Sequence, residues 1–274
     1  MSSPLQIDIQ DGIARLTLNR PERHNAFDAA TIAALDAAFD AVSADARVRV
    51  LVLAANGPSF SAGADLDWMR AAAARPSSEN LDDARCLARM LQKLSMLDKP
   101  TIARVQGPAY GGGVGLIAAC DIAIATRNAR FALTEVRLGL IPAAIGPHVI
   151  RAIGERYAHR YLLTAEVFTA ETAREIGLLH ELVANESGLD VVMQDLTLSL
   201  MKNGPRALAA CKQLIAGVAG QPVSPALVED TAQRIATIRA GSEAQEGMRA
   251  FLERRSPRWC ERNSQDIAPC STKS

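Results

Sequence analysis

Three consecutive glycines, Gly111, Gly112 and Gly113, stand where an extended apolar segment passes into an apolar helical one. The run before them, residues 101–105, predicts a strand, and the apolar residues after them predict a helix. Glycines carry no β-carbon, so a ligand atom can approach the backbone N–H groups directly. The amino end of the helix directs its partial positive charge at the same place. Such a junction suits a negative charge that develops on an oxygen atom.

A second stretch, residues 60–66 with the sequence Phe-Ser-Ala-Gly-Ala-Asp-Leu, has similar features. It follows a strand-like run, residues 48–53, and presents small residues with accessible N–H groups. Two such turns can supply two donors to one oxygen. Taken alone, the glycine run is equally consistent with a flexible turn or a close helix–strand contact. Phosphate binding fits less well, because the run lacks both the Gly-Lys-Ser/Thr ending of a P-loop and the glycine spacing of a dinucleotide site.

The composition excludes several functional classes. The chain has 274 residues, with 30 Lys and Arg against 30 Asp and Glu, so no overall field favours nucleic acid or membrane binding. Five cysteines without a Cys-x-x-Cys pair indicate reduced thiols, and four scattered histidines show no metal spacing. There is no targeting pattern and no apolar run of the roughly 20 residues that a membrane span needs. These features predict a cytoplasmic protein with no metal site.

The elements around the two turns predict an α/β fold. The first residues read as a hairpin that turns at Asp11-Gly12, and Asp28 reads as the N-cap of a helix. A loop at residues 75–78 precedes a helix for which Asn80 is a candidate cap, and residues 131–135 read as a short extended piece. Strand, turn and helix recur in the manner of stacked β/α units with mostly parallel strands. Beyond about residue 185 the pattern is helical only, and Ser224-Pro225 reads as another helix start.

Several motifs in fixed order resemble the crotonase (enoyl-CoA hydratase/isomerase) superfamily. They are Asn19-Arg20-Pro21, the 60–66 turn, the glycine run with Ala119-Cys120-Asp121, and Glu135-x-x-x-Gly139-x-x-Pro142. The resemblance implies a ClpP-like spiral of β-β-α units followed by a C-terminal helical region. It also implies a core at residues 1–200 that contains an acyl-CoA site, and an oligomerisation region at 201–274 that builds a homotrimer or a dimer of trimers.

The same resemblance implies roles for individual residues. The thioester oxygen is expected between the N–H groups of Ala64 and Gly112. Glu135 corresponds to one of two glutamates that activate water in hydratases of the family, whereas Gly115 stands at the position of the other. Coenzyme A contacts are expected from Arg23, His24, Ala62, Ala64, Asp65, Leu66, Asp67 and Gly112 and from the helix near Phe251, with Arg254 or Arg255 as further candidates for the phosphates.

The missing carboxylate leaves the reaction open. Local similarity favours a bacterial methylglutaconyl-CoA hydratase of leucine degradation, whereas a lone glutamate also resembles a Δ3,Δ2-enoyl-CoA isomerase. Decarboxylation of a glutaconyl-type thioester, or a non-catalytic binding role linked to RNA, are further alternatives. No cofactor is expected apart from the coenzyme A of the substrate. Gly115 is expected to enlarge the acyl pocket, which Trp68, Met69, Leu140 and Ile145 could wall. Arg137, His148 and Tyr110 are candidates to bind a distal carboxylate.

Overall fold

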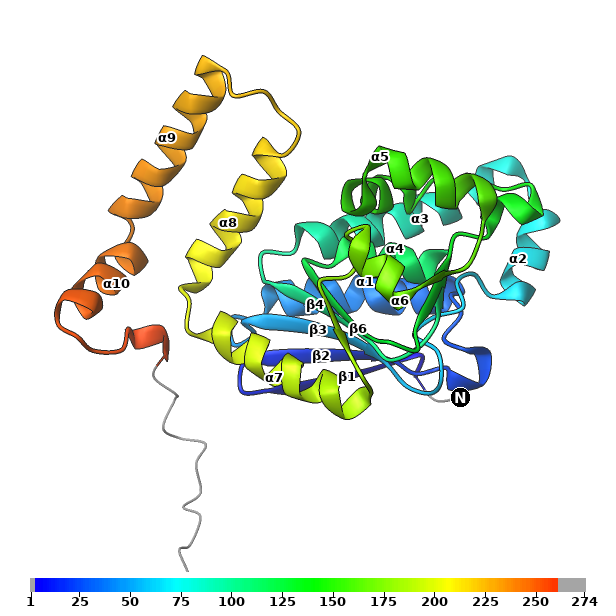
Figure 1. The fold of residues 1–274 in the computed structure, drawn as a ribbon, viewed down its shortest axis with the longest axis horizontal. Helices are drawn as coiled ribbons and strands as arrows, with labels where there is room; N and C mark the ends of the chain where they lie inside the picture. The colour runs from blue at the N-terminus through cyan, green and yellow to red at the C-terminus, as the bar shows by residue number, and fades with distance from the viewer. Residues whose placement is uncertain (1–2, 261–274) are drawn as a thin grey trace, which may run out of the picture. The chain divides into compact units, whose positions relative to one another are not determined.

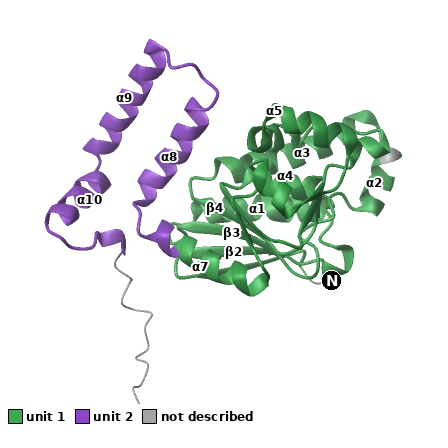
Figure 2. Cartoon of the chain, viewed as in Figure 1, with its two compact units in different colours: residues 1–197 green, residues 198–274 purple. Residues whose placement is uncertain are grey.

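A computed structural model describes residues 3–260 of the chain (Figure 1). The chain divides into two compact units, Met1–Thr197 and Leu198–Ser274 (Figure 2). The first unit carries both glycine-containing turns and Glu135, and the second is helical. None of the helices in the described part of the chain is both long enough and apolar enough to span a membrane.

The first unit alternates strands and helices along the chain. Its strands are β1 (Leu5–Gln10), β2 (Ile13–Leu18), β3 (Val50–Ala55), β4 (Thr101–Val105), β5 (Ala109–Tyr110), β6 (Ile122–Thr126), β7 (Arg130–Ala132), β8 (Phe168–Thr169) and β9 (Glu181–Val183). Its helices are α1 (Ala29–Ala44), α2 (Leu66–Ala73), α3 (Ser77–Met96), α4 (Gly112–Ala119), α5 (Gly146–Thr164), α6 (Ala170–Glu175) and α7 (Glu186–Met201), with short 3-10 helices η1 (Pro21–Arg23) and η2 (Glu135–Leu138).

The strands form two sheets that agree with the predicted α/β class. The larger sheet has the order β1-β2-β3-β4-β6-β9, and every pair in it except the β1–β2 hairpin is parallel. The hairpin turns at Asp11 and Gly12, both of which have positive φ. A smaller sheet has the order β5-β7-β8. The recurring strand and helix units therefore build the mostly parallel architecture that the sequence predicts.

Alternating side chains place the core on one face of the larger sheet. Leu16, Leu51 and Leu53 point to this face and join one hydrophobic cluster with the buried stripes of α1 and α3. On the opposite face Arg104 of β4 pairs with Asp190 of α7 at 2.8 Å. The carboxyl ends of β3 and β4 lead into the two glycine-containing turns, so the sheet delivers both turns to the same edge.

Two local predictions are confirmed and two are wrong. Asp28 accepts a bond from the Thr31 N–H, and Ser224 accepts one from the Leu227 N–H, so both are N-caps. Asn80 does not cap α3, because the helix already begins at Ser77. Pro76, the residue before Ser77, has an extended backbone with ψ 152°, so the helix begins immediately after the proline. The extended piece ends at Ala132, and Glu135 instead opens η2.

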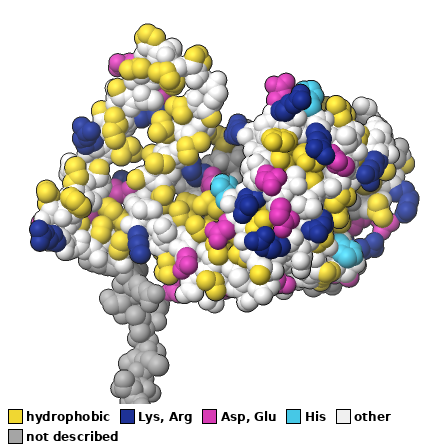
Figure 3. Space-filling model, viewed as in Figure 1, with side chains coloured by type: hydrophobic (Ala, Val, Ile, Leu, Met, Phe, Trp, Pro, Cys, Tyr) yellow, Lys and Arg dark blue, Asp and Glu magenta, His cyan; other side chains and the backbone are white. Residues whose placement is uncertain are grey.

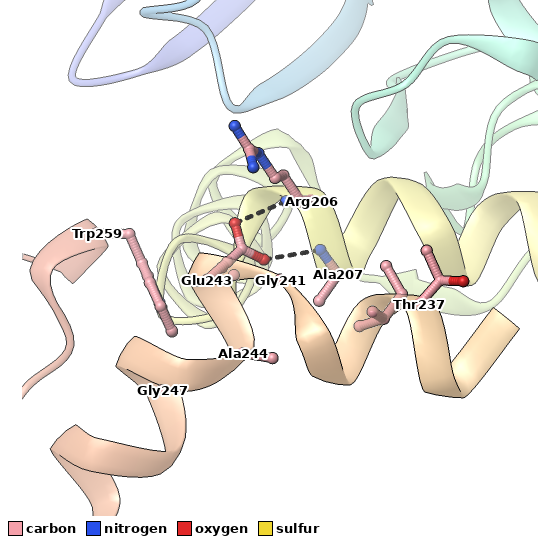
Figure 4. A pocket seen from close by; sticks show the side chains of 10 residues that line it. Arg206, Ala207, Thr237, Gly241, Glu243, Ala244, Gly247 and Trp259 are labelled. Carbon is pink, nitrogen blue, oxygen red and sulfur yellow. Dashed lines mark hydrogen bonds between the residues drawn. The ribbon is translucent and has the colours of Figure 1, made fainter.

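The second unit consists of α8 (Pro205–Val218), α9 (Pro225–Ala240), α10 (Ser242–Leu252) and a 3-10 turn, η3 (Arg258–Cys260). A cavity of about 280 Å³ lies among these helices (Figure 4). The Glu243 carboxylate beside it accepts hydrogen bonds from the N–H groups of Arg206 and Ala207, at 3.0 and 2.8 Å. Glu243 therefore caps the amino end of α8, and the anion-binding capacity of that helix end is already used within the chain.

Candidate active site

The two glycine-containing turns lie directly against each other. Ser61 and Ala109 form an isolated parallel bridge, and the Tyr110 N–H donates to the Ser61 carbonyl at 2.9 Å. Gly63 has φ +86°, and a β-carbon there would lie 2.9 Å from the Tyr110 carbonyl oxygen. A β-carbon on Gly113 would lie 2.8 Å from the Ser61 carbonyl oxygen. Both glycines are therefore needed for the close approach of the two backbones.

Within the 60–66 turn, the Ala64 N–H differs from its neighbours. The Ala62 N–H donates to the His24 carbonyl at 2.9 Å, and the Gly63 N–H donates to the Ser61 hydroxyl at 3.2 Å. The Asp65 N–H donates to the Phe27 carbonyl at 2.8 Å. No acceptor within residues 3–260 takes the Ala64 N–H. Because backbone donors in a folded chain are nearly always paired, this N–H is available to a ligand.

Gly112 supplies a second available donor. It is the first residue of α4, and the N–H groups of the first helical turn have no acceptor within the helix. The preceding N–H, from Gly111, is already bonded to the Ala132 carbonyl at 2.9 Å. Gly111 has φ +46°, a left-handed conformation that directs the chain into α4. The structure therefore offers donors from Ala64 and Gly112 on two turns that pack together.

Glu135 reaches the glycine junction from η2. Its Oε1 atom lies 2.9 Å from the position that a β-carbon on Gly111 would occupy. The other carboxyl oxygen, Oε2, is buried and has no hydrogen-bond partner among the described residues. Burial raises the pKa of the Glu135 carboxyl above its ordinary value. Glu135 is therefore a half-buried carboxyl with a raised pKa, packed on the residue before the Gly112 donor, and such a group can accept and return a proton.

The expected space at Gly115 is absent. A β-carbon on Gly115 would lie 2.7 Å from Ile145 Cβ and closer still to Ile145 Cγ2. Gly115 is buried on α4, and Ile145, only 2% exposed, immediately precedes α5. The prediction that the missing side chain enlarges the acyl pocket is therefore wrong, because Ile145 fills the space. Ile145 packs on α4 instead of lining the far wall of a pocket opened by Gly115.

The expected coenzyme A residues lie along the line where the 19–27 loop meets the 60–66 turn. His24 joins the two stretches, since its carbonyl accepts from Ala62 and its Nδ1 lies 3.0 Å from the Ser59 hydroxyl. Arg23 and Asp67 form an exposed ion pair at 3.3 Å. Leu66, at the start of α2, is 72% exposed. The structure therefore brings these residues together at the protein surface beside Ala64.

Asp65 has a different place from the one expected, because it is bonded within the chain. Its carboxylate caps α2 by accepting from the Asp67 and Trp68 N–H groups. It also pairs with Arg20 at 3.2 Å, and its side chain is only 6% exposed. Arg20 in turn pairs with Asp28 at 2.9 Å. Asp65 thus holds the 60–66 turn against the start of α1.

Several residues expected to bind the distal carboxylate or the coenzyme A phosphates interact with other groups of the chain. The Arg137 guanidinium donates to the Ala165 carbonyl at 2.8 Å. Burial, with a contribution from nearby Arg151, lowers the pKa of His148. In the second unit Arg255 binds Glu246 and Glu253, each at 2.7 Å, and the bond to Arg255 lowers the pKa of Glu246 to about 2.

No three His, Cys, Asp or Glu side chains within residues 3–260 are grouped as metal ligands. The functional groups that the described part of the site brings together are two backbone donors and one carboxyl. Such a site can bind a carbonyl oxygen, stabilise the charge that develops on it, and move a proton at a neighbouring carbon.

A model of the enoyl-CoA hydratase/isomerase family matches residues 8–262. The chain belongs to this family. Its fold is the crotonase fold: the crystal structure of an enoyl-CoA hydratase from Shewanella pealeana superposes with a TM-score of 0.91. That protein is 43% identical, and the match covers 93% of this chain and 96% of the other.

Curated relatives in the enoyl-CoA hydratase/isomerase family differ in the acyl group that their names give. The 2,3-dehydroadipyl-CoA hydratase of Escherichia coli is 33% identical over 256 residues, which cover 93% of this chain and 98% of the relative. The mevalonyl-coenzyme A hydratase of Aspergillus fumigatus is 32% identical over 254 residues, covering 90% and 91%. Membership of the family therefore leaves the acyl group undefined.

The contacts of three residues of the site could not be predicted from the sequence. Gly111 belongs to the glycine run, but nothing in the sequence shows that the Glu135 carboxyl packs on it. Ile145 was expected near the site, yet its contact with Gly115 depends on how α5 packs on α4. Phe27 lies in the 19–27 loop, and its contacts with both donor turns depend on the fold.

Proposed function

We propose that the protein is an enoyl-CoA hydratase that acts on a short, branched enoyl thioester such as 3-methylglutaconyl-CoA. The observation that carries the proposal is that two turns packed together each supply an available N–H, from Ala64 and Gly112, with the Glu135 carboxyl packed on the adjacent Gly111. The donors bind the thioester oxygen, and Glu135 handles the proton. Coenzyme A enters as part of the substrate, and the proposal includes no separate cofactor or metal.

In the proposed reaction Glu135 removes a proton from water while the water oxygen bonds to the β-carbon of the substrate. The electron pair of the double bond moves toward the thioester, and the resulting enolate oxygen is held by Ala64 and Gly112. Glu135 then passes the proton to the α-carbon, which restores the carbonyl and the free carboxylate. Removing one such donor typically costs about 10²–10³-fold in rate, which is the contribution asked of each N–H.

The branched acyl group is supported by local sequence similarity and not by an open space at Gly115. Residues 60–69, 80–85 and 131–142 resemble methylglutaconyl-CoA hydratases most closely. Relatives named for dehydroadipyl and mevalonyl thioesters show that the family accommodates both dicarboxylic and branched chains.

The test is a comparison of kcat/KM for crotonyl-CoA, 3-methylcrotonyl-CoA and 3-methylglutaconyl-CoA, followed as loss or gain of the conjugated thioester absorbance. We expect the branched, dicarboxylic substrate to have the highest value. A clear preference for crotonyl-CoA or a longer straight chain would reject the branched assignment while leaving hydration intact. Failure to hydrate any of the three would reject the hydratase proposal.

A second candidate, a Δ3,Δ2-enoyl-CoA isomerase, is favoured by one observation. Ile145, and not a carboxylate, packs on Gly115, the α4 residue one turn after Gly112. Among the described residues, Glu135 is the one carboxyl that contacts the three-glycine junction. A single base can move a proton between two carbons without a bound water. Decarboxylation would likewise use the donors alone. Mass spectrometry after reaction in heavy water separates them: hydration adds the mass of one heavy-water molecule, isomerisation adds no mass beyond deuterium exchange, and decarboxylation removes carbon dioxide.

We further propose that residues 201–274 assemble the chain into a trimer or a dimer of trimers in the cytoplasm. The second unit exposes large apolar side chains on α8, α9 and α10, among them Ile215 (65%), Ile235 (54%) and Phe251 (83%). Hydrophobic side chains cover much of the face of this unit that Figure 3 shows. Sedimentation at micromolar concentration should show a multiple of three, and removal of residues from 242 onward should reduce both assembly and thioester affinity. A monomer at that concentration would reject this part.

A further inference from the structure

Phe27 forms backbone hydrogen bonds on both sides of Ala64. Its N–H donates to the Gly63 carbonyl at 2.7 Å, and its carbonyl accepts from the Asp65 N–H at 2.8 Å. These two bonds form the parallel bridge between Phe27 and Ala64. They fix the peptide planes on either side of Ala64, and so determine the direction in which the Ala64 N–H points.

The side chain of the same residue contacts the other donor. A β-carbon on Gly112 would lie 2.9 Å from both Cδ2 and Cε2 of the Phe27 ring. The ring therefore rests on the Gly112 α-carbon, at the point where α4 begins. Phe27 is only 2% exposed and belongs to the main hydrophobic cluster, so the ring is held firmly from behind.

The loop that carries Phe27 is itself held by several bonds. The Asn25 amide nitrogen donates to the carbonyls of Asn56 and Ser59, at 2.8 and 2.9 Å, and Asn25 is 2% exposed. The Arg20 guanidinium donates to the Ala26 carbonyl at 2.9 Å. Phe27 therefore cannot shift without breaking buried hydrogen bonds, which makes it a rigid reference for both donors.

We propose that Phe27 is a positioning residue that sets the separation and relative direction of the Ala64 and Gly112 N–H groups. The inference rests on the proposed function, because it assumes that these two groups bind one thioester oxygen. Two donors on different turns stabilise one oxyanion only when both lie within hydrogen-bond distance of it. Phe27 links the two turns by its backbone on one side and its ring on the other.

The first test compares Phe27→Leu with Phe39→Leu. Phe39 on α1 is fully buried in the same cluster, so both substitutions remove a ring from the core and lower stability. We expect Phe27→Leu to lower kcat by about 10–100-fold with a smaller change in KM, because a displacement of about 1 Å in a catalytic group can cost 10²-fold. Phe39→Leu should change kcat by less than about 3-fold, because Phe39 forms no bridge to Ala64 and no contact with Gly112, so neither donor is displaced.

A spectroscopic measurement separates positioning from general destabilisation. The probe is saturated 3-methylbutyryl-CoA, labelled with ¹³C at the thioester carbonyl and bound to each protein in excess enzyme. Hydrogen bonds to the oxygen polarise the carbonyl and lower its stretching frequency, which infrared difference spectra record. The wild type and Phe39→Leu should give the same downward shift, and Phe27→Leu a smaller one.

A double-mutant cycle tests the ring contact directly. Gly112→Ala introduces the β-carbon that meets the ring, and should therefore lower kcat/KM in the wild-type background. In the Phe27→Leu background the same substitution should cost at least 5-fold less, an interaction of about 1 kcal/mol by RT ln 5. If Gly112→Ala does not fold, the comparison of the two leucine variants still decides the matter.

Equal kcat and equal carbonyl shifts for Phe27→Leu and Phe39→Leu would overturn the inference and leave the hydratase proposal standing. A wild-type protein that hydrates enoyl thioesters but gives no downward carbonyl shift would reject the two-donor arrangement, and Phe27 with it. A wild-type protein without turnover and without a shift would reject both proposals together.

Discussion

Substituting Gly115 by alanine should destabilise the protein, because Ile145 already occupies the place of the new methyl group. The new carbon would lie 2.7 Å from Ile145 Cβ. Carbon atoms pack at about 3.5–4.0 Å, so α4 or the backbone around Ile145 must move by about 1 Å, because a new rotamer would shift Cγ2 but leave Cβ in place. Overpacking of this kind usually costs about 1–3 kcal/mol.

The assay is urea unfolding of the full-length protein, followed by circular dichroism for each variant. Gly115→Ala should lower the unfolding free energy by about 1–3 kcal/mol. Gly146→Ala is the matched control, since no neighbouring atom lies within 4 Å of a β-carbon at Gly146. The control should be neutral or stabilise by up to about 1 kcal/mol, because it restricts the unfolded chain.

Removing Ile145 should reverse the effect. In the Ile145→Gly background the new methyl enters a cavity, and Gly115→Ala should be neutral or stabilise by about 0.8 kcal/mol. The coupling between the two positions should then be about 1–4 kcal/mol. Ile145→Ala should give an intermediate result, since it removes Cγ2 but leaves the β-carbon at 2.7 Å. An equal cost of Gly115→Ala in all three backgrounds would refute the packing explanation.

Three further predictions follow from the structure. Glu135→Gln should lower kcat by about 10²–10⁴-fold with little change in thioester affinity. Burial raises the pKa of Glu135, so wild-type kcat/KM should rise as the pH passes through that raised pKa and the carboxylate forms. The protonated form contributes stability that is fully present below the ordinary pKa of a glutamate and is lost as the pH rises through the raised pKa. Glu135→Gln should show neither change, in pH–activity profiles or in urea titrations. Arg20→Met should lower the free energy of unfolding in urea by about 3 kcal/mol, because it leaves the buried Asp65 carboxylate without its counter-ion. Arg23→Met removes an exposed ion pair and should cost less than about 1 kcal/mol. Equal losses for the two variants would contradict this prediction.

Local rules predict much of the scaffold. The hairpin at Asp11-Gly12 and the caps at Asp28 and Ser224 depend on residues next to one another in the chain, and all three are found. The α3 start was missed because two signals competed, and the proline took precedence over the asparagine cap. A cap is therefore predicted correctly where one candidate stands at the start of the helix, and less well where several neighbouring residues could start it.

The site is predicted in kind, but its shape is not. The glycine run and the 60–66 turn indicate small residues and available N–H groups, because a residue without a β-carbon leaves the backbone accessible. What contacts each glycine is a tertiary property. Gly111 contacts Glu135, Gly112 contacts Phe27, and Gly113 contacts Ser61, although nothing in their sequence order distinguishes them. A missing side chain shows that space is needed but does not show what occupies it.

This distinction changes how Gly115 relates to the chemistry. On α4, Gly112 and Gly115 lie one turn apart, and the first is covered by the Phe27 ring and the second by Ile145. Two bulky, buried side chains, from the loop before α1 and from the start of α5, therefore pack on the same face of α4 one turn apart. Both contacts restrict the movement of the amino end of α4, which carries the Gly112 N–H. Gly115 therefore allows α5 to pack closely on α4, and it leaves no extra volume beside the proposed oxyanion site.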